Sequence, residues 1–184
     1  MGESTPSIRT LSSREVYRNR WMCVREDEIE RSSGQRGIYG VVDKHPCAVI
    51  IPLEGDTLYL VEQFRYTVQR VCREFPQGGW ERADVDLEQL ARGELREETG
   101  FTSQTMVYLG PMYVAYGFAS QMQHAFLATG LVPGATDFDA EEHDLKLLPV
   151  KVADFERMLG TGEIRDCCTL AAWGLYKVWK ERQG

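Results

Sequence analysis

The chain has 184 residues, 43% of them hydrophobic, which suffices for the core of one ordinary domain and leaves little room for a second. Its formal charge of −7 argues against a broad basic surface for a nucleic-acid backbone, although a bound metal or a local cation could still hold a small anionic ligand. No apolar run approaches the roughly 20 residues that cross a bilayer, and residues 1–10 lack the order of a signal peptide. The five scattered cysteines form no CxxC pair. We therefore expect a cytoplasmic protein that contacts neither nucleic acid nor membrane.

The N-terminal part is rich in β-forming residues. Residues 1–12 are polar and are expected to be loose. Turn-forming residues at 32–34 and 54–56 separate the β-rich runs, and the second turn would join its two flanking runs as a hairpin. The expected strands span 21–30, 37–42, 48–53 and 57–64.

A helix is expected from about Asp86 to Thr99, because the apolar residues there recur at helical spacing and Gly100 follows as a stop. Strands are then expected at 106–114, 124–129 and 145–150. A short helix capped by Asp154 and ending near Gly160 follows, and the last helix runs from Thr169 to about Glu181. This order of elements predicts an α+β fold with a mixed sheet between helices.

Three acids share the apolar face of the helix at 86–99. At about 100° per residue, Glu94, Glu97 and Glu98 lie on the side of Leu90 and Leu95. Carboxylates that face inward suffer desolvation and mutual repulsion, which a hard divalent cation such as Mg²⁺ relieves. The alternative is a surface helix whose acids are solvated or paired with arginines.

The segment 79–101 resembles the Nudix box, whose pattern is G, five residues, E, seven residues, R-E-U-x-E-E-x-G-U, with U aliphatic or aromatic. Two positions depart from it, because Val85 replaces the first glutamate and Gly93 replaces the arginine. In the family these two residues help to orient the metal-binding carboxylates, so their loss should loosen the ligands without deleting them. The positions that match are Gly79, Glu94, Leu95, Glu97, Glu98, Gly100 and Phe101.

The resemblance extends over roughly residues 38–180 to the ADP-ribose pyrophosphatase and nucleotide-sugar diphosphatase branch. The segments 61–66, 73–79, 116–120 and 162–166 carry it. It implies a Nudix fold with an N-terminal antiparallel β section at 1–44 and a hydrolase domain at 45–184. In this branch the N-terminal section commonly contributes to a homodimer, and residues 14–42 could do so here.

The resemblance also implies the site residues. Glu94, Glu97, Glu98 and the Gly78 carbonyl would bind Mg²⁺ or Mn²⁺. The general base would be Glu141, with Glu142 as second choice and Glu97 as a further catalytic residue; the alternative for 139–144 is a solvated acidic loop. Arg65, Glu74 and Gly79 would contact the substrate, whereas the alternative for Arg65 and Glu74 is a strand-end ion pair.

The implied reaction is metal-dependent hydrolysis of the pyrophosphate bond of a nucleoside diphosphate derivative, ADP-ribose or a nucleotide sugar, which gives two monophosphates. Two alternatives stay open. The first alternative is a nucleotide-binding module that kept the fold and lost efficient catalysis, as Val85 and Gly93 would allow. The second is a Nudix hydrolase of another nucleotide class.

Overall fold

The computed structural model describes residues 7–80, 86–134 and 145–184. Two units are distinguished: one comprises residues up to His45 together with Tyr113–Gln121, and the other comprises Pro46–Met112 with Met122–Gly184. No helix within the described ranges is long and apolar enough to cross a membrane. All five cysteines are free thiols.

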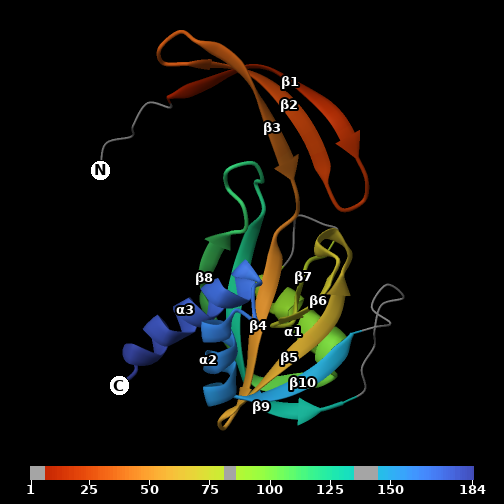
Figure 1. Cartoon of the computed structure of the whole chain (residues 1–184), viewed down its shortest axis with the longest axis vertical. Helices are drawn as coiled ribbons and strands as arrows, with labels where there is room; N and C mark the ends of the chain where they lie inside the picture. Colours follow the sequence, from red (N-terminus) through yellow and green to blue (C-terminus); the bar gives the residue numbers. More distant parts are fainter. Residues whose placement is uncertain (1–6, 81–85, 135–144) are drawn as a thin grey trace. The chain divides into compact units, whose positions relative to one another are not determined.

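The first unit is built on an antiparallel sheet of three strands in the order β1-β2-β3 (Figure 1). The strands are β1 (Ile8–Arg18), β2 (Cys23–Arg31) and β3 (Arg36–Asp43). The expectation that residues 1–12 are loose is wrong from Ile8 onward, because β1 pairs with β2 from Ile8↔Arg31 to Arg18↔Cys23. Opposite charges face each other across this pair, with Arg9 2.6 Å from Glu30 and Arg14 3.1 Å from Glu26. A polar strand is therefore held by its neighbour.

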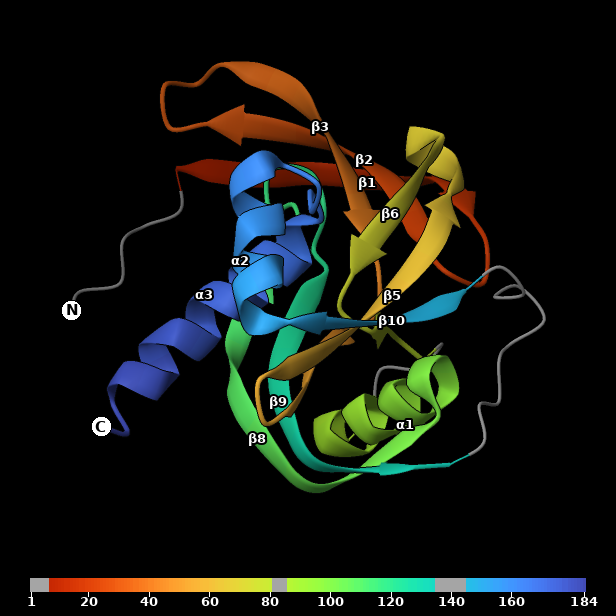
Figure 2. The ribbon, with the colours of Figure 1, turned by 60° about the horizontal axis from the view of Figure 1, so that its bottom comes forward.

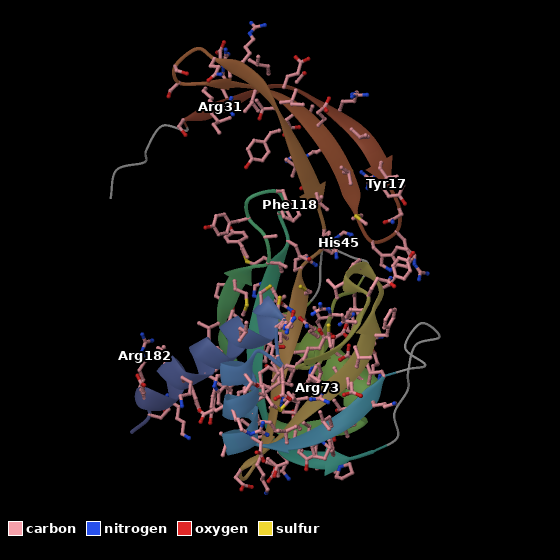
Figure 3. The ribbon with its side chains drawn as sticks, in the orientation of Figure 1. Tyr17, Arg31, His45, Arg73, Phe118 and Arg182 are labelled. Carbon is pink, nitrogen blue, oxygen red and sulfur yellow. The ribbon has the colours of Figure 1, made fainter. Side chains whose placement is uncertain are left out.

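The connection between β8 (Phe101–Tyr113) and β9 (Met122–Pro133) belongs to this first unit. Phe118, labelled in Figure 3, accepts a hydrogen bond of 2.8 Å at its carbonyl from the Val42 amide, and the Ser120 amide donates to the Val42 carbonyl at 3.0 Å. The Tyr39 hydroxyl donates to the Gly117 carbonyl at 2.8 Å. Val42 and Ala119 therefore form an isolated parallel bridge between β3 and this connection.

The second unit contains a mixed sheet in the order β10-β5-β4-β9-β8, with β6 paired to β5 and β7 paired to β4. β4 and β5 form the expected hairpin around Gly55, whose φ is 60°, and β4 runs parallel to β9. The strands are β4 (Cys47–Glu54), β5 (Thr57–Arg65), β6 (Arg70–Glu74), β7 (Gln77–Gly78), β8 (Phe101–Tyr113), β9 (Met122–Pro133) and β10 (Lys146–Lys151), and a 3-10 turn at Tyr66–Val68 precedes β6.

Helices cover both faces of this sheet, as Figure 2 shows. Alternate residues of β4 point to opposite faces. Ile50 packs in one cluster with Leu90 and Leu95 of α1 (Leu87–Thr99). Ile51 packs in another with residues of α2 (Val152–Thr161) and α3 (Cys167–Glu181). The α+β fold with a mixed sheet between helices is thus confirmed.

The helix ends correct two expectations. Asp86 lies at the expected start of α1 and caps it by accepting a 2.8 Å bond from the Gln89 amide. Asp154, in contrast, is not the cap of α2: it lies in the first turn, and Lys151 occupies the cap position without a side-chain bond. α3 begins two residues before Thr169, because the Asp166 carboxylate caps it at the Thr169 amide over 2.7 Å.

Phe155 should be a large contributor to the stability of the second unit. Its ring is fully buried, 5.1 Å from the Phe75 ring and 4.9 Å from the Trp173 ring. Phe155→Ala should lower the free energy of unfolding by about 3–5 kcal/mol in urea titrations, because it removes apolar contacts and leaves a cavity. Leu170→Ala, on the exposed side of α3, should change it by only about 0.5 kcal/mol. Equal losses for the two variants would contradict this packing.

Candidate active site

The short strand β7 brings the loop that contains Gly78 and Gly79 against helix α1. It pairs with β4 through Ala48↔Gly78 and Val49↔Gln77. The Gln77 amide donates a hydrogen bond of 3.1 Å to Oε2 of Glu98. A Cβ added to Gly78 would lie only 2.7 Å from Cδ of Glu94, so this carboxylate occupies the space that a side chain at 78 would fill. Two carboxylates of α1 therefore lie directly on β7.

These two carboxylates are buried. Glu94 is 7% exposed and Glu98 is 4% exposed, whereas Glu97 remains partly exposed, 3.8 Å from Arg96. Arg92 turns away to Glu88 and the Ser103 carbonyl. The alternative of a surface helix with solvated acids is therefore wrong for Glu94 and Glu98.

The residues present fit a divalent cation. Acids one helical turn apart have Cβ atoms about 5–6 Å from each other, so the carboxylates of Glu94 and Glu98 share one small region next to the backbone of Gly78. Hard cations such as Mg²⁺ and Mn²⁺ prefer carboxylate and carbonyl oxygens. Negative charge buried in this way is costly unless a cation or hydrogen bonds offset it. The donor set therefore suits Mg²⁺ or Mn²⁺.

An ion pair joins Arg65, at the end of β5, to Glu74, at the end of β6. Nε of Arg65 donates to Oε1 of Glu74 at 2.7 Å, and the Arg65 guanidinium also contacts this oxygen through its Nη2. Burial raises the pKa of Glu74, against the opposing attraction of Arg65. Although burial disfavours its charge, attraction to Glu74 raises the pKa of Arg65. The strand-end ion pair foreseen as an alternative for these residues is thus present in the structure.

Asp166 ties the same loop to α3. Its Oδ2 accepts from Nε2 of Gln77 at 3.0 Å, and also from the amide and hydroxyl of Thr169 at 2.7 and 2.8 Å. The Thr169 hydroxyl in turn accepts from the Phe75 amide at 2.9 Å. Asp166 has ligand atoms within 4.8 Å of the thiols of Cys167 and Cys168, but three donors already engage its Oδ2. Its evident role is to cap α3 and anchor the loop.

Sequence reasoning missed three polar residues of this region. Asp166 had a signal, since an aspartate three residues before Thr169 is the usual spacing of a helix cap. Gln77 and Gln123 had none, because their side chains meet across 46 positions of the sequence, with Nε2 of Gln123 donating to Oε1 of Gln77 at 2.8 Å. Gln123 is 2% exposed, and its Oε1 has no hydrogen-bond partner among the described residues.

Trp80 explains how the helix accommodates Gly93. A Cβ at position 93 would lie 2.8 Å from Cζ2 of Trp80, so the indole occupies the place of the missing side chain. A hollow of about 340 Å³ beside it is lined in part by Trp80, Gly93 and Glu97. Val85, Glu141 and Glu142 lie outside the described residues.

Comparison with known proteins shows the family to which the chain belongs. A model of the NUDIX domain matches residues 43–165, and a model of the nucleoside diphosphate sugar hydrolase N-terminal domain matches residues 8–42. An ADP-ribose pyrophosphatase of Bacillus subtilis is 27% identical over 168 residues, which cover 89% of each chain. The ADP compounds hydrolase NudE of Escherichia coli is 23% identical over 186 residues, which cover 100% of this chain and 99% of the relative. A crystal structure of an ADP compounds hydrolase matches with a TM-score of 0.86 at 22% identity, covering 100% of this chain and 99% of the other.

The chain therefore belongs to the Nudix family. More specifically, it is a Nudix pyrophosphohydrolase related to the ADP-ribose pyrophosphatases.

Glu74 should make stability depend on pH. Burial raises its pKa above the ordinary 4.5, so the folded state holds the proton more tightly than the unfolded chain. This stabilisation is complete below pH 4.5 and is lost as the pH rises through the folded-state pKa. The unfolding free energy of the wild type minus that of Glu74→Gln should therefore fall as the pH is raised, in urea titrations between about pH 4 and 8. Glu181→Gln, which removes an exposed carboxylate, is the control. Parallel curves for wild type and Glu74→Gln would disprove the effect.

Gly93 should tolerate no side chain while Trp80 is present. In an exposed helix, Gly→Ala normally stabilises by about 0.4–1 kcal/mol, and Gly174→Ala in α3, where no atom lies within 4 Å of the added Cβ, should do so. Gly93→Ala should instead lower the free energy of unfolding by about 1–3 kcal/mol, because the methyl group displaces the indole. Thermal unfolding of both variants tests this, and stabilisation by Gly93→Ala would contradict the contact.

Proposed function

We propose that the chain hydrolyses the pyrophosphate bond of ADP-ribose or a nucleotide sugar with Mg²⁺ or Mn²⁺ and releases two monophosphates. One observation carries the proposal: three glutamates lie on adjacent turns of α1, and two of them, Glu94 and Glu98, are buried against β7. Such an oxygen-rich region suits cations that bind a diphosphate.

Each residue has a definite task in this proposal. Glu94, Glu97 and Glu98 would hold the cation together with the Gly78 carbonyl, and the Gln77 amide keeps the Glu98 carboxylate in place. When bound, the metal supplies positive charge against the growing charge of the diphosphate and lowers the pKa of a bound water. Gly79 has no room for a side chain, because an added Cβ would lie 2.9 Å from the Pro46 carbonyl, and its bare backbone would contact the phosphates.

The proton acceptor and the substrate contacts belong to the same proposal. Glu141 is the first candidate for the base that takes the proton of the attacking water, Glu142 is the second, and Glu97 is a further catalytic candidate. Arg65 and Glu74 would contact the substrate from the end of β5 and β6, where their ion pair holds the Arg65 fork in one orientation.

The substrate class is supported by both family matches. The N-terminal match, to the nucleoside diphosphate sugar hydrolase N-terminal domain, ends at residue 42, and the NUDIX match begins at residue 43. The relatives named ADP-ribose pyrophosphatase include one from Mycobacterium tuberculosis, 27% identical over 164 residues, covering 88% of this chain and 79% of the relative. We accordingly keep 1–44 as an N-terminal β section and 45–184 as the hydrolase domain.

A homodimer in the cytoplasm completes the proposal. The strands of the first unit expose large apolar side chains, including Val16, which is 55% exposed, and Ile38, which is 66% exposed. Ile29 of β2 is buried. Such exposed side chains favour contact with a second copy of the β section.

A binding module without efficient catalysis is the second candidate, favoured by the loss of the box arginine at Gly93. The packing of Trp80 over Gly93 argues against a binding module. The indole fills the space of the lost side chain, and α1 remains packed on the sheet.

Product analysis with a panel of nucleoside diphosphate derivatives and Mg²⁺ or Mn²⁺ tests the two candidates. The wild type should release two monophosphates from ADP-ribose or a nucleotide sugar. Glu98→Gln should lower kcat/KM at least about 100-fold with the fold intact, because a metal ligand is neutralised. Glu88→Gln, on the exposed side of the same helix, is the matched control and should keep activity. Saturable nucleotide binding by the wild type with turnover no faster than Glu98→Gln would establish the binding module instead.

A further inference from the structure

The side-chain amide of Gln77 is engaged from three different elements. Its Nε2 donates to Oε2 of Glu74 at 3.2 Å and to Oδ2 of Asp166 at 3.0 Å. Its Oε1 accepts from Nε2 of Gln123 at 2.8 Å. These partners come from the end of β6, the cap of α3 and the strand β9. One amide therefore joins two strands of the sheet to a helix cap.

This arrangement needs a primary amide of this length. Both N–H groups point at carboxylates, and the carbonyl faces another amide donor, so each polar atom of the Gln77 side chain has a suitable partner. A carboxylate at position 77 would instead face two carboxylates, and an apolar side chain would remove one hydrogen bond each from Glu74, Asp166 and Gln123.

The backbone of the same residue touches the proposed metal ligands. The Gln77 amide donates to Glu98, and the next residue, Gly78, lies against the carboxylate of Glu94. β7 consists of these two residues alone and pairs with β4 at two positions, and next to them the Ile50 amide donates to the Pro76 carbonyl at 2.9 Å. So short a ladder gives the peptide little rigidity by itself, and the side chain of Gln77 supplies further attachment.

We propose that Gln77 is a positioning residue of the hydrolase: its side chain fixes the 77–78 backbone, and that backbone holds Glu98 and Glu94 in the arrangement that binds the divalent cation. The inference rests on the proposed function for the role of these carboxylates. It extends that function to β9 and α3 by way of Gln123 and Asp166, whose side chains hydrogen-bond to this amide.

The first test compares Gln77→Met with the wild type. Methionine keeps the length of the side chain and removes the amide. We expect a 10- to 100-fold loss of Mn²⁺ affinity, measured without substrate from the free Mn²⁺ signal in electron paramagnetic resonance, and a similar fall in kcat with little change in KM. Gln89→Met, which removes an exposed amide on α1, is the matched control and should leave both unchanged.

The second test exchanges donor and acceptor. Gln77→Glu alone should weaken Mn²⁺ binding at least as much as Gln77→Met, because it places a third carboxylate beside Glu74 and Asp166. Adding Asp166→Asn provides an N–H for that new carboxylate and still leaves an oxygen to cap Thr169. The double variant should therefore recover a large part of the Mn²⁺ affinity that Gln77→Glu loses, which a merely structural role of Gln77 would not produce.

The outcomes separate this inference from the proposed function. If the wild type releases no monophosphates, the proposed function fails, while the Mn²⁺ titrations still decide the role of Gln77. A folded Gln77→Met that binds Mn²⁺ like the wild type would overturn the inference. If Gln77→Met does not fold, the absence of recovery in the double variant relative to Gln77→Glu overturns it, and recovery supports it.

Discussion

Burial of acid on the inner face of α1 is the constraint on which the rest of this site depends. Glu94 and Glu98 lie on the face that also carries Leu90 and Leu95 into the core, and both are nearly inaccessible to solvent. Charge in such a place costs free energy unless hydrogen bonds or a cation offset it. The Gln77 amide meets Glu98 and the bare backbone of Gly78 admits the Glu94 carboxylate, so the neighbouring strand is shaped around the two acids.

The two faces of the sheet are thereby coupled. α1 packs on one face, and α2 and α3 pack on the other. The loop at β7 lies where both layers can reach it, because the backbone of Gln77 contacts α1 while its side chain contacts the cap of α3. The Thr169 hydroxyl, bonded both to Asp166 and to the Phe75 amide, attaches the beginning of this loop to the same cap. The arrangement of the acids is in this way a property of both layers.

Departures from the family pattern change local packing more than they change the ligand set. The box arginine would need space beside Gly93, and here the indole of Trp80 fills that space. Glu94, Glu97 and Glu98 stay where the resemblance predicts acids, on one side of an unbroken helix that runs from Leu87 to Thr99. Val85 and the acids at 141 and 142 lie outside the described residues, so their roles remain predictions.

The sequence by itself determined what depends on neighbours along the chain. The helical period and Gly100 defined α1 and placed Glu94 and Glu98 inward, and the turn at Gly55 defined the β4–β5 hairpin. Only the tertiary structure decided what depends on distant partners. β1 is polar and becomes a strand because β2 pairs with it, and Gln77 and Gln123 meet across 46 positions of sequence. The reason is physical: a helix face repeats every few residues, whereas strand pairing and buried amide networks join segments whose spacing along the chain carries no periodic signal.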